Sequence, residues 1–320
     1  MKRKKIPASI SLDLDDKWSY MKVHGDPGWE KFPSYLDIVL PKVLDILDRL
    51  DIKITFFVVG QDAALERNHS ILRSIVQRGH EIANHSFHHE SWLKTYSKEK
   101  IEEEIRIAEE AIEKATGKKT NMFRGPGFSW SNDLLEVLQK RGYLFDASIL
   151  PTYLSPLMRR YYFWKSKLTK EQKKSRKELF GSFKEGFYPL KPFNWKLNSG
   201  KALLEIPVTT MPVFKIPFHQ SYLIYISNIS YNLMKCYLWF SVFMCKLTRT
   251  SPSYLLHPLD LIGSREAPEL AFFPGMNVQQ EEKIKIFETA LTILKKNFEV
   301  LPMGKFAEQL SGRQKEINCK

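Results

Sequence analysis

The sequence is poor in cysteine. Cys236, Cys245 and Cys319 are the only three among 320 residues, an odd number without the spacing of metal ligands. A disulfide framework is therefore not expected, and a reducing compartment is favoured. A thiolate metal site is excluded as well, because no cysteine lies near the polar motifs described below.

Long apolar runs are also missing. The N-terminus, Met1 to Pro7, is basic but has no apolar h-region or cleavage site, so we expect a protein that is not exported by a signal peptide. The most apolar segment, at about 222–249, contains Asn228 and Lys235, and its uninterrupted part is shorter than the ~20 residues that span a bilayer. We expect a buried helix there, and a helix lying on a membrane surface is the alternative.

Acidic residues are outnumbered. There are 49 lysines and arginines against 36 acidic residues, and the formal net charge of +13 indicates an anionic partner. That partner can be nucleic acid, an anionic membrane or an acidic substrate. No nucleic-acid-binding motif is present, so we expect no nucleic acid. Repeats and flexible linkers are absent too, and 43% hydrophobic residues are enough for one domain over 1–320.

What the sequence does contain is an alternation of apolar strands and amphipathic helices, which predicts a parallel sheet or barrel. The expected strands are 8–14, 52–59, 81–83, 120–124, 143–147, 203–208, 253–257 and 298–301, and the expected helices are 36–50, 64–78, 97–115, 131–141 and 279–296. Residues 17–35 read as an active-site loop. Residues 151–201 are basic and aromatic and indicate an insertion, helical in its charged middle, which is either a solvated helix or a functional lid.

Polar residues follow the ends of these strands, where α/β folds keep their chemistry. His85 and His89 lie four residues apart after one strand, and Asp15-Asp16 ends another. Two imidazoles and one carboxylate form a three-ligand metal site with open positions. His88 is the nearest rival ligand. Three more residues follow other strands: Arg124, Asp146 and His257.

These motifs resemble those of the NodB-type polysaccharide deacetylases, which are metal-dependent carbohydrate esterases. The matching segments are Asp13-Leu14-Asp15-Asp16-Lys17, His85-Ser86-Phe87-His88-His89, Arg124-Gly125-Pro126-Gly127 and Tyr254-Leu255-Leu256-His257. The histidine motif is the most specific match. The resemblance implies a distorted (β/α) barrel and covers most of the chain outside the 151–201 insertion and part of 222–250.

The resemblance also implies a role for each residue of the motifs. Asp15 would be the catalytic base, paired with Arg124, and His257 the general acid. Asp16, His85 and His89 would bind the metal, and Ser86 would fix their loop through a hydrogen bond. Pro126 and Leu255 would line the substrate site, with Leu255 at the acyl methyl.

Three departures from the family pattern are visible. Lys17 stands in place of a glycine and Gly127 in place of a tyrosine, and the Asp–Trp motif has no clean match. Asp146 would take the place of that aspartate, which in the family adjusts the acidity of the general-acid histidine. The missing Tyr and Trp shape the polymer groove in the family, so their loss argues against a long polysaccharide substrate.

The expected function is removal of an acetyl or formyl group from an amino sugar of a polysaccharide or a lipid-linked glycan. The cofactor would be a divalent metal, with zinc preferred and cobalt or another first-row ion also suited. A cytoplasmic protein, with peripheral contact to the anionic inner face of the membrane, would fit the basic charge. The alternatives are hydrolysis of a non-sugar amide, or a non-catalytic protein that binds membranes or glycans.

Overall fold

The computed structural model describes residues 5–157, 160, 183–310 and 314–319. The strands are β1 (Pro7–Leu14), β2 (Thr55–Val58), β3 (Glu81–Asn84), β4 (Met122–Phe123), β5 (Phe145–Asp146), β6 (Phe193–Lys196), β7 (Ala202–Glu205), β8 (Ser253–Leu256), β9 (Glu299–Leu301) and β10 (Glu316–Asn318). The helices are α1 (Lys17–His24), α2 (Leu36–Arg49), α3 (Gly60–Ala64), α4 (His69–Gln77), α5 (Lys98–Thr116), α6 (Asn132–Lys140), α9 (Gln220–Ser227), α10 (Tyr231–Leu247), α11 (Gln280–Asn297) and α12 (Met303–Glu308).

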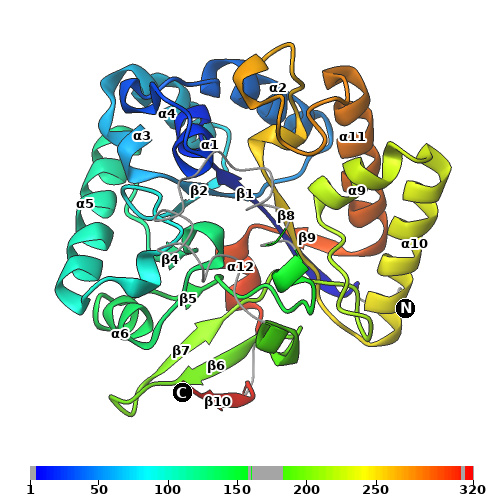
Figure 1. The fold of residues 1–320 in the computed structure, drawn as a ribbon. Helices are drawn as coiled ribbons and strands as arrows, with labels where there is room; N and C mark the ends of the chain where they lie inside the picture. The colour runs from blue at the N-terminus through cyan, green and yellow to red at the C-terminus, as the bar shows by residue number, and fades with distance from the viewer. Residues whose placement is uncertain (1–4, 158–159, 161–182, 311–313, 320) are drawn as a thin grey trace.

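One curved sheet runs through the molecule in the order β10-β6-β7-β5-β4-β3-β2-β1-β8, with β9 also paired to β1. Neighbours are parallel except β6 and β7. Helices surround the strands in Figure 1, and β6, β7 and β10 extend to one side. The segment after β7 bridges to β8, since the Thr209 amide donates to the Ser253 carbonyl at 3.0 Å. The expected distorted barrel is therefore confirmed.

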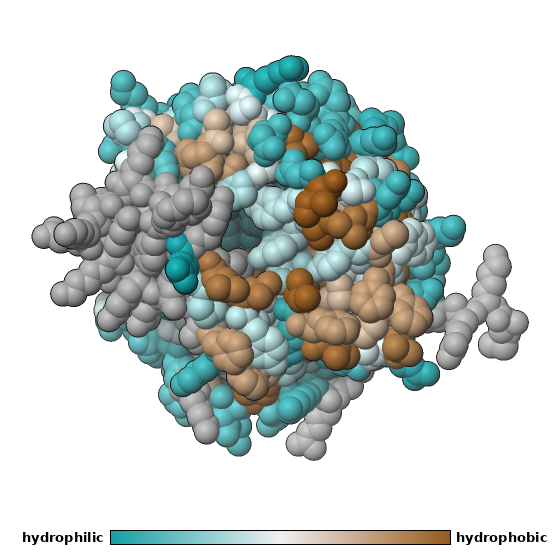
Figure 2. Space-filling model, turned by 45° about the vertical axis from the view of Figure 1, so that its right-hand side comes forward, coloured by the Kyte–Doolittle hydropathy of each residue, from teal (hydrophilic) through white to brown (hydrophobic). Residues whose placement is uncertain are grey.

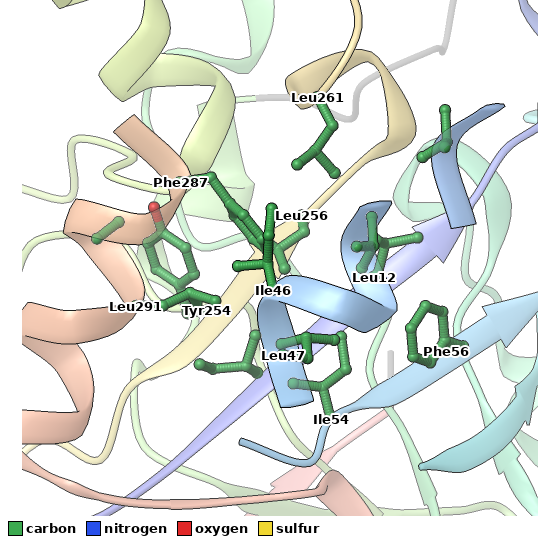
Figure 3. Close-up of a cluster of buried hydrophobic side chains, with 14 of the residues drawn as sticks. Leu12, Ile46, Leu47, Ile54, Phe56, Tyr254, Leu256, Leu261, Phe287 and Leu291 are labelled. Carbon is green, nitrogen blue, oxygen red and sulfur yellow. The ribbon is translucent and has the colours of Figure 1, made fainter. Parts of the chain in front are cut away.

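Strand β1 separates a polar interior from an apolar exterior. Successive side chains of a strand point to opposite faces. Ile10 and Leu12 face outward into the main hydrophobic core, where side chains of β1, β2 and β8 meet those of α2 and α11 (Figure 3). Ser11 and Asp13 lie on the opposite face and contact the buried Arg124. Because both faces are buried, the strand can carry charged groups inside the barrel.

The barrel is closed at the amino ends of its strands by α12. The carboxylate of Glu81, on β3, accepts hydrogen bonds from the Gly304 and Lys305 amides in the first turn of α12. Met303 and Phe306 of the same helix are fully buried against the strands. The open end of the barrel is therefore the carboxyl end, where the polar motifs lie.

Three local predictions differ from the structure. Residues 17–24 form α1 rather than a loop, because the Asp16 carboxylate accepts from the Lys17 amide and caps the helix. The predicted 64–78 helix begins later, because α3 ends at Ala64, a 3-10 turn follows at Glu66–Asn68, and α4 starts only at His69. The apolar segment at 222–249 forms two helices, α9 and α10, that meet at about 228–230.

The insertion can be followed only in part. Its charged middle lies outside the described residues, but its end contributes β6, whose antiparallel pairing with β7 the sequence pattern did not predict. None of the helices in the described ranges is long and apolar enough to cross a membrane.

Candidate metal centre

Asp15, His85 and His89 come together at the open end of the barrel. Asp15 Oδ1 lies 3.2 Å from His85 Nε2 and 3.0 Å from His89 Nε2. One ligand atom from each of the three residues lies within 4.8 Å of the others, and all three residues are buried. Two imidazole nitrogens and one carboxylate oxygen are the donor set of a catalytic first-row metal site.

The loop after β3 turns both histidines toward Asp15. Ser86 and His89 have positive φ angles of 60° and 54°, so the backbone adopts the left-handed conformation at two positions of this short segment. The Nδ1 atom of His85 lies 2.7 Å from the Arg124 carbonyl oxygen, which can only accept a hydrogen bond. Nδ1 therefore carries a proton, and Nε2, the ring nitrogen that faces Asp15, is the atom that can bind a metal once it is deprotonated.

The carboxylate of Asp15 and the imidazole of His85 shift each other's pKa values toward their charged forms. Burial alone raises the pKa of Asp15, but attraction to His89 and hydrogen bonds from both histidines outweigh it and hold that pKa well below its ordinary value. Burial lowers the pKa of His85, yet the carboxylates of Asp13 and Asp15 raise it above its ordinary value overall. The cluster thus favours a carboxylate at Asp15, the form that binds a cation.

Asp16 lies outside this cluster, contrary to the prediction that it is the third ligand. Its Oδ1 accepts hydrogen bonds from the amides of Lys17 at 2.7 Å and Tyr35 at 3.0 Å. Side chains one residue apart at a strand end point in opposite directions, so only one of the pair can face the histidines. Burial raises the pKa of Asp16 to about 6.

Arg124 pairs with Asp13 rather than with the predicted Asp15. Arg124 Nη1 lies 2.5 Å from Asp13 Oδ1 and also donates to Ser11 Oγ at 2.9 Å. Its Nε donates to the Ala147 carbonyl at 3.0 Å. The guanidinium is fully buried, so this ion pair holds Asp13 in one orientation beside Asp15.

Asp146 supports the loop of Arg124 instead of the general-acid histidine. Its Oδ1 accepts from Ser148 Oγ at 2.6 Å, and that hydroxyl accepts from the Gly125 amide at 2.8 Å. Burial raises the pKa of Asp146 to about 6 and that of its neighbour Glu205 well above the ordinary value. The carboxylate near His257 belongs to Asp260, whose Oδ2 lies 3.9 Å from His257 Nδ1.

A cavity of about 620 Å³ contains the centre. Asp13, Asp15, His85, His89 and His257 all line it. The cavity wall is mostly aromatic and apolar, and includes Tyr20, Phe128, Tyr222, Tyr225, Leu259, Phe272 and Phe273. The arrangement therefore brings the histidine expected to act as the acid into the same chamber as the possible metal site.

Two predicted substrate residues lie behind this wall. Pro126 is buried and opens the turn that carries Gly127 and Phe128 into the cavity. Leu255 packs with Leu150 and Val208 in a small buried cluster, which Phe128 covers. Both shape the cavity through Phe128 rather than by lining it.

The remaining polar residues of the histidine motif, Ser86 and His88, are not part of the ligand cluster. His88 turns away and pairs with Glu104, with 48% of its side chain exposed, so it is no rival ligand. Ser86 Oγ finds no hydrogen-bond partner among the described residues, and the loop is tied instead by the Ser86 amide, which donates to Asn84 Oδ1. The predicted hydrogen bond of the Ser86 side chain is therefore not observed.

Sequence reasoning missed Asp13 and most of the cavity wall. The spacing of Asp13 and Asp15 was a usable signal, because residues two apart on a strand face the same side. The wall residues Tyr222, Phe272 and Phe273 come from segments far from the motifs, and no local pattern connects them to the site. Gly127 has φ 59°, and a Cβ there would meet Ser91 Cβ at 3.0 Å, so a tyrosine at this position would strain the loop.

The fold and the cluster together define the class: an α/β barrel with an Asp–His–His centre at the carboxyl ends of its strands. Residues 9–145 match the model of the polysaccharide deacetylase family. The family that the motifs indicated is thus the one whose model matches this part of the chain.

Individual relatives cover part of the chain. The peptidoglycan-N-acetylmuramic acid deacetylase of Bacillus subtilis is 35% identical over 104 residues, which are 32% of this chain and 38% of that protein. A chitooligosaccharide deacetylase of Sinorhizobium fredii is 31% identical over 106 residues, or 33% of this chain and 48% of that protein. The chain thus spans less than half the length of these curated relatives.

One solved structure shares the whole fold. A crystal structure from Mycobacterium smegmatis, provisionally named a polysaccharide deacetylase, superposes with a TM-score of 0.59 at 18% identity. The superposition covers 98% of this chain and 94% of that chain, so the regions outside residues 9–145 share the architecture as well.

Proposed function

We propose that this chain is a metal-dependent hydrolase that removes an acetyl or formyl group from the nitrogen of an amino sugar, carried on a polysaccharide or a lipid-linked glycan. The observation that carries the proposal is the meeting of Asp15, His85 and His89 in one cavity with Asp13 and His257. The deacetylase names of its relatives for peptidoglycan and chitooligosaccharides support this substrate class.

In this proposal Asp15, His85 and His89 hold the metal, with zinc preferred. The donor set suits zinc, cobalt and other first-row ions, and the proton on His85 Nδ1 leaves Nε2 free to bind. When bound, such an ion lowers the pKa of a coordinated water and polarises the acyl carbonyl.

Asp13 takes the role of base that the motif comparison assigned to Asp15. It lines the cavity, and its ion pair with Arg124 fixes the carboxylate within the barrel. A carboxylate fixed in this way can accept the proton of an attacking water. Asp15 is unsuited to act as the base, because its Oδ1 lies within 3.2 Å of the Nε2 atoms of both His85 and His89, the proposed metal ligands.

His257 is the proposed general acid. Its side chain is 21% exposed and lines the cavity, so it can reach a leaving nitrogen. Amines leave poorly unless they are protonated, and a positioned imidazole can supply that proton. The Asp260 carboxylate accepts from the His257 amide at 2.9 Å and holds the backbone of this residue in place.

The test is release of acetate and formate from N-acetyl and N-formyl amino sugars, their oligomers, and simple amides, with and without added zinc. We expect zinc-dependent release from the sugars and little from the simple amides. If acetate or formate is released from the simple amides alone, the substrate is a non-sugar amide and not an amino sugar. No release from any compound by the zinc-loaded protein would contradict the hydrolase proposal.

A further inference from the structure

Helix α10 is apolar on both of its sides. Met234, Leu238 and Val242 are buried against the core. On the opposite face Leu233, Phe240, Phe243 and Leu247 follow one another at spacings of seven, three and four residues and are 48%, 46%, 56% and 65% exposed. A helix of a soluble domain ordinarily carries polar residues on its outer face. The outer face of α10 is thus built for contact with something apolar.

Neighbouring segments enlarge this surface. The Phe214 ring lies 6.1 Å from that of Phe240, and Val213 beside it is 70% exposed. Ile229, at the turn between α9 and α10, is 78% exposed. We call these residues together the α10 patch: Val213, Phe214, Ile229, Leu233, Trp239, Phe240, Phe243 and Leu247. Figure 2 shows apolar side chains gathered on the face turned toward the viewer.

A basic groove of about 920 Å³ borders the patch at the end of α10. Lys5, Lys246 and Arg249 line it, together with Trp239, Phe243 and Leu247 of the patch. No acidic side chain is among the groove's described lining residues. The groove therefore offers several cations directly beside exposed aromatic rings.

The sequence around the patch is free of acidic residues. No aspartate or glutamate occurs between Glu205 and Asp260, whereas this stretch contains Lys215, Lys235, Lys246 and Arg249. A second copy of the chain would bring cations against cations, so charge disfavours self-association through this face. A surface that is apolar and negatively charged complements both features at once.

We propose that the α10 patch and its basic groove dock this protein on the surface of a membrane that contains anionic phospholipid. The apolar side chains enter the boundary between headgroups and acyl chains, and the lysines and arginine meet the lipid phosphates. Large exposed apolar patches on soluble domains mark such interaction sites.

Docking through this face has a consequence for the cavity. Helix α9 packs against α10 and contributes Tyr222 and Tyr225 to the cavity wall. The docked protein therefore holds one wall of its cavity close to the lipid surface. If the proposed function holds, its substrate is an amino sugar attached to a lipid rather than a free polymer.

The test is flotation of the full chain with vesicles of phosphatidylcholine, alone or with one-third phosphatidylglycerol. We expect binding to the anionic vesicles that weakens at high salt. Phe240→Ser/Phe243→Ser should weaken binding at least about tenfold, and Lys246→Glu/Arg249→Glu at least about tenfold, since each cation contributes roughly fivefold. Hydrolysis of a soluble amino-sugar substrate, measured in parallel, should be unchanged in both variants.

Two matched controls alter exposed residues elsewhere. Leu144→Ser removes an apolar side chain that is 48% exposed, and Lys201→Glu reverses an exposed charge. Both should bind vesicles as the wild type does, and circular dichroism should confirm that all variants are folded. Failure of the wild type to bind anionic vesicles, or undiminished binding by the folded patch variants, would overturn the proposal. A dimer that Phe240→Ser/Phe243→Ser converts to a monomer, without vesicle binding, would do so too.

Discussion

Arg124 Nη1 lies 2.5 Å from Asp13 Oδ1 inside the barrel, and Asp15, two residues further along, faces His85 and His89. The two carboxylates thus share one side of the strand end but have different partners. Asp13 is held by the buried guanidinium of Arg124. Asp15 can bind a cation together with the imidazoles of His85 and His89. This division of partners separates the proposed base from the proposed metal ligand.

The first prediction concerns Asp13. Asp13→Asn removes the proposed base and should lower kcat by at least about 100-fold, with zinc binding largely kept because Asp13 is outside the ligand cluster. Steady-state deacylation and a zinc titration check both parts. Asp37→Asn, at an exposed position of α2, is the control and should behave as wild type. Wild-type turnover in Asp13→Asn would remove Asp13 from the mechanism.

The second prediction concerns the stability of the ion pair. Arg124→Met leaves Asp13 buried without its partner and should lower the free energy of unfolding by roughly 3–5 kcal/mol. Asp13→Asn/Arg124→Met should lose less than Arg124→Met alone, since no unpaired charge remains. Urea denaturation of the wild type, both single variants and the double variant measures this coupling. Additive losses would show that the two residues do not depend on each other.

The third prediction concerns the general acid. His257→Ala should slow release of acetate from an N-acetyl sugar by roughly 100-fold or more. It should affect 4-nitrophenyl acetate much less, because that leaving group needs no proton. His88→Ala, whose side chain points away from the cavity, is the matched control. Equal losses on the amide and the ester would assign His257 a role in binding or folding.

The fourth prediction is a pH dependence of stability that comes from Asp146. Burial raises its pKa to about 6 in the folded protein, so folding favours the protonated form. This contribution is present below the ordinary pKa and is lost as the pH rises through about 6. Asp146→Asn cannot ionise and should become more stable relative to wild type between pH 4 and pH 7.5, by about 1–3 kcal/mol.

Urea denaturation at these two pH values measures that difference. Glu136→Gln, at a residue that pairs with Lys98 near the surface, controls for general effects of removing a carboxylate. If the difference between Asp146→Asn and wild type stays constant with pH, Asp146 does not titrate as its burial implies.

Much of the fold could be predicted from local pattern. The apolar face of α2 and the Ser97 and Gly117 ends of α5 were visible in the sequence, and the structure agrees within one or two residues. The spacing of His85 and His89 also sufficed, because a single loop after one strand carries both residues. Features of this kind depend on neighbours within a few residues.

Other features depend on contacts between distant segments. Strand β6 pairs with β7 and β10. Its residues Phe193-Asn194-Trp195-Lys196 alternate as a strand does, but no local pattern identifies the strands with which it pairs. Strand alternation could have indicated that Asp15, rather than Asp16, faces the histidines, but comparison with the family motif pointed to Asp16. The aromatic cavity wall joins α1, α9 and the segment before α11, which only the folded chain brings together.

Asp15, rather than Asp16, is the carboxylate on which the proposed metal centre depends. Asp15→Asn and Asp16→Asn are matched, since asparagine at 16 can still accept the hydrogen bonds that begin α1. Titration of the metal-free proteins with zinc should show at least about 100-fold weaker binding for Asp15→Asn, beyond the usual effect of a supporting residue. Asp16→Asn should bind nearly as the wild type does. The reverse order of affinities would contradict the metal centre described above.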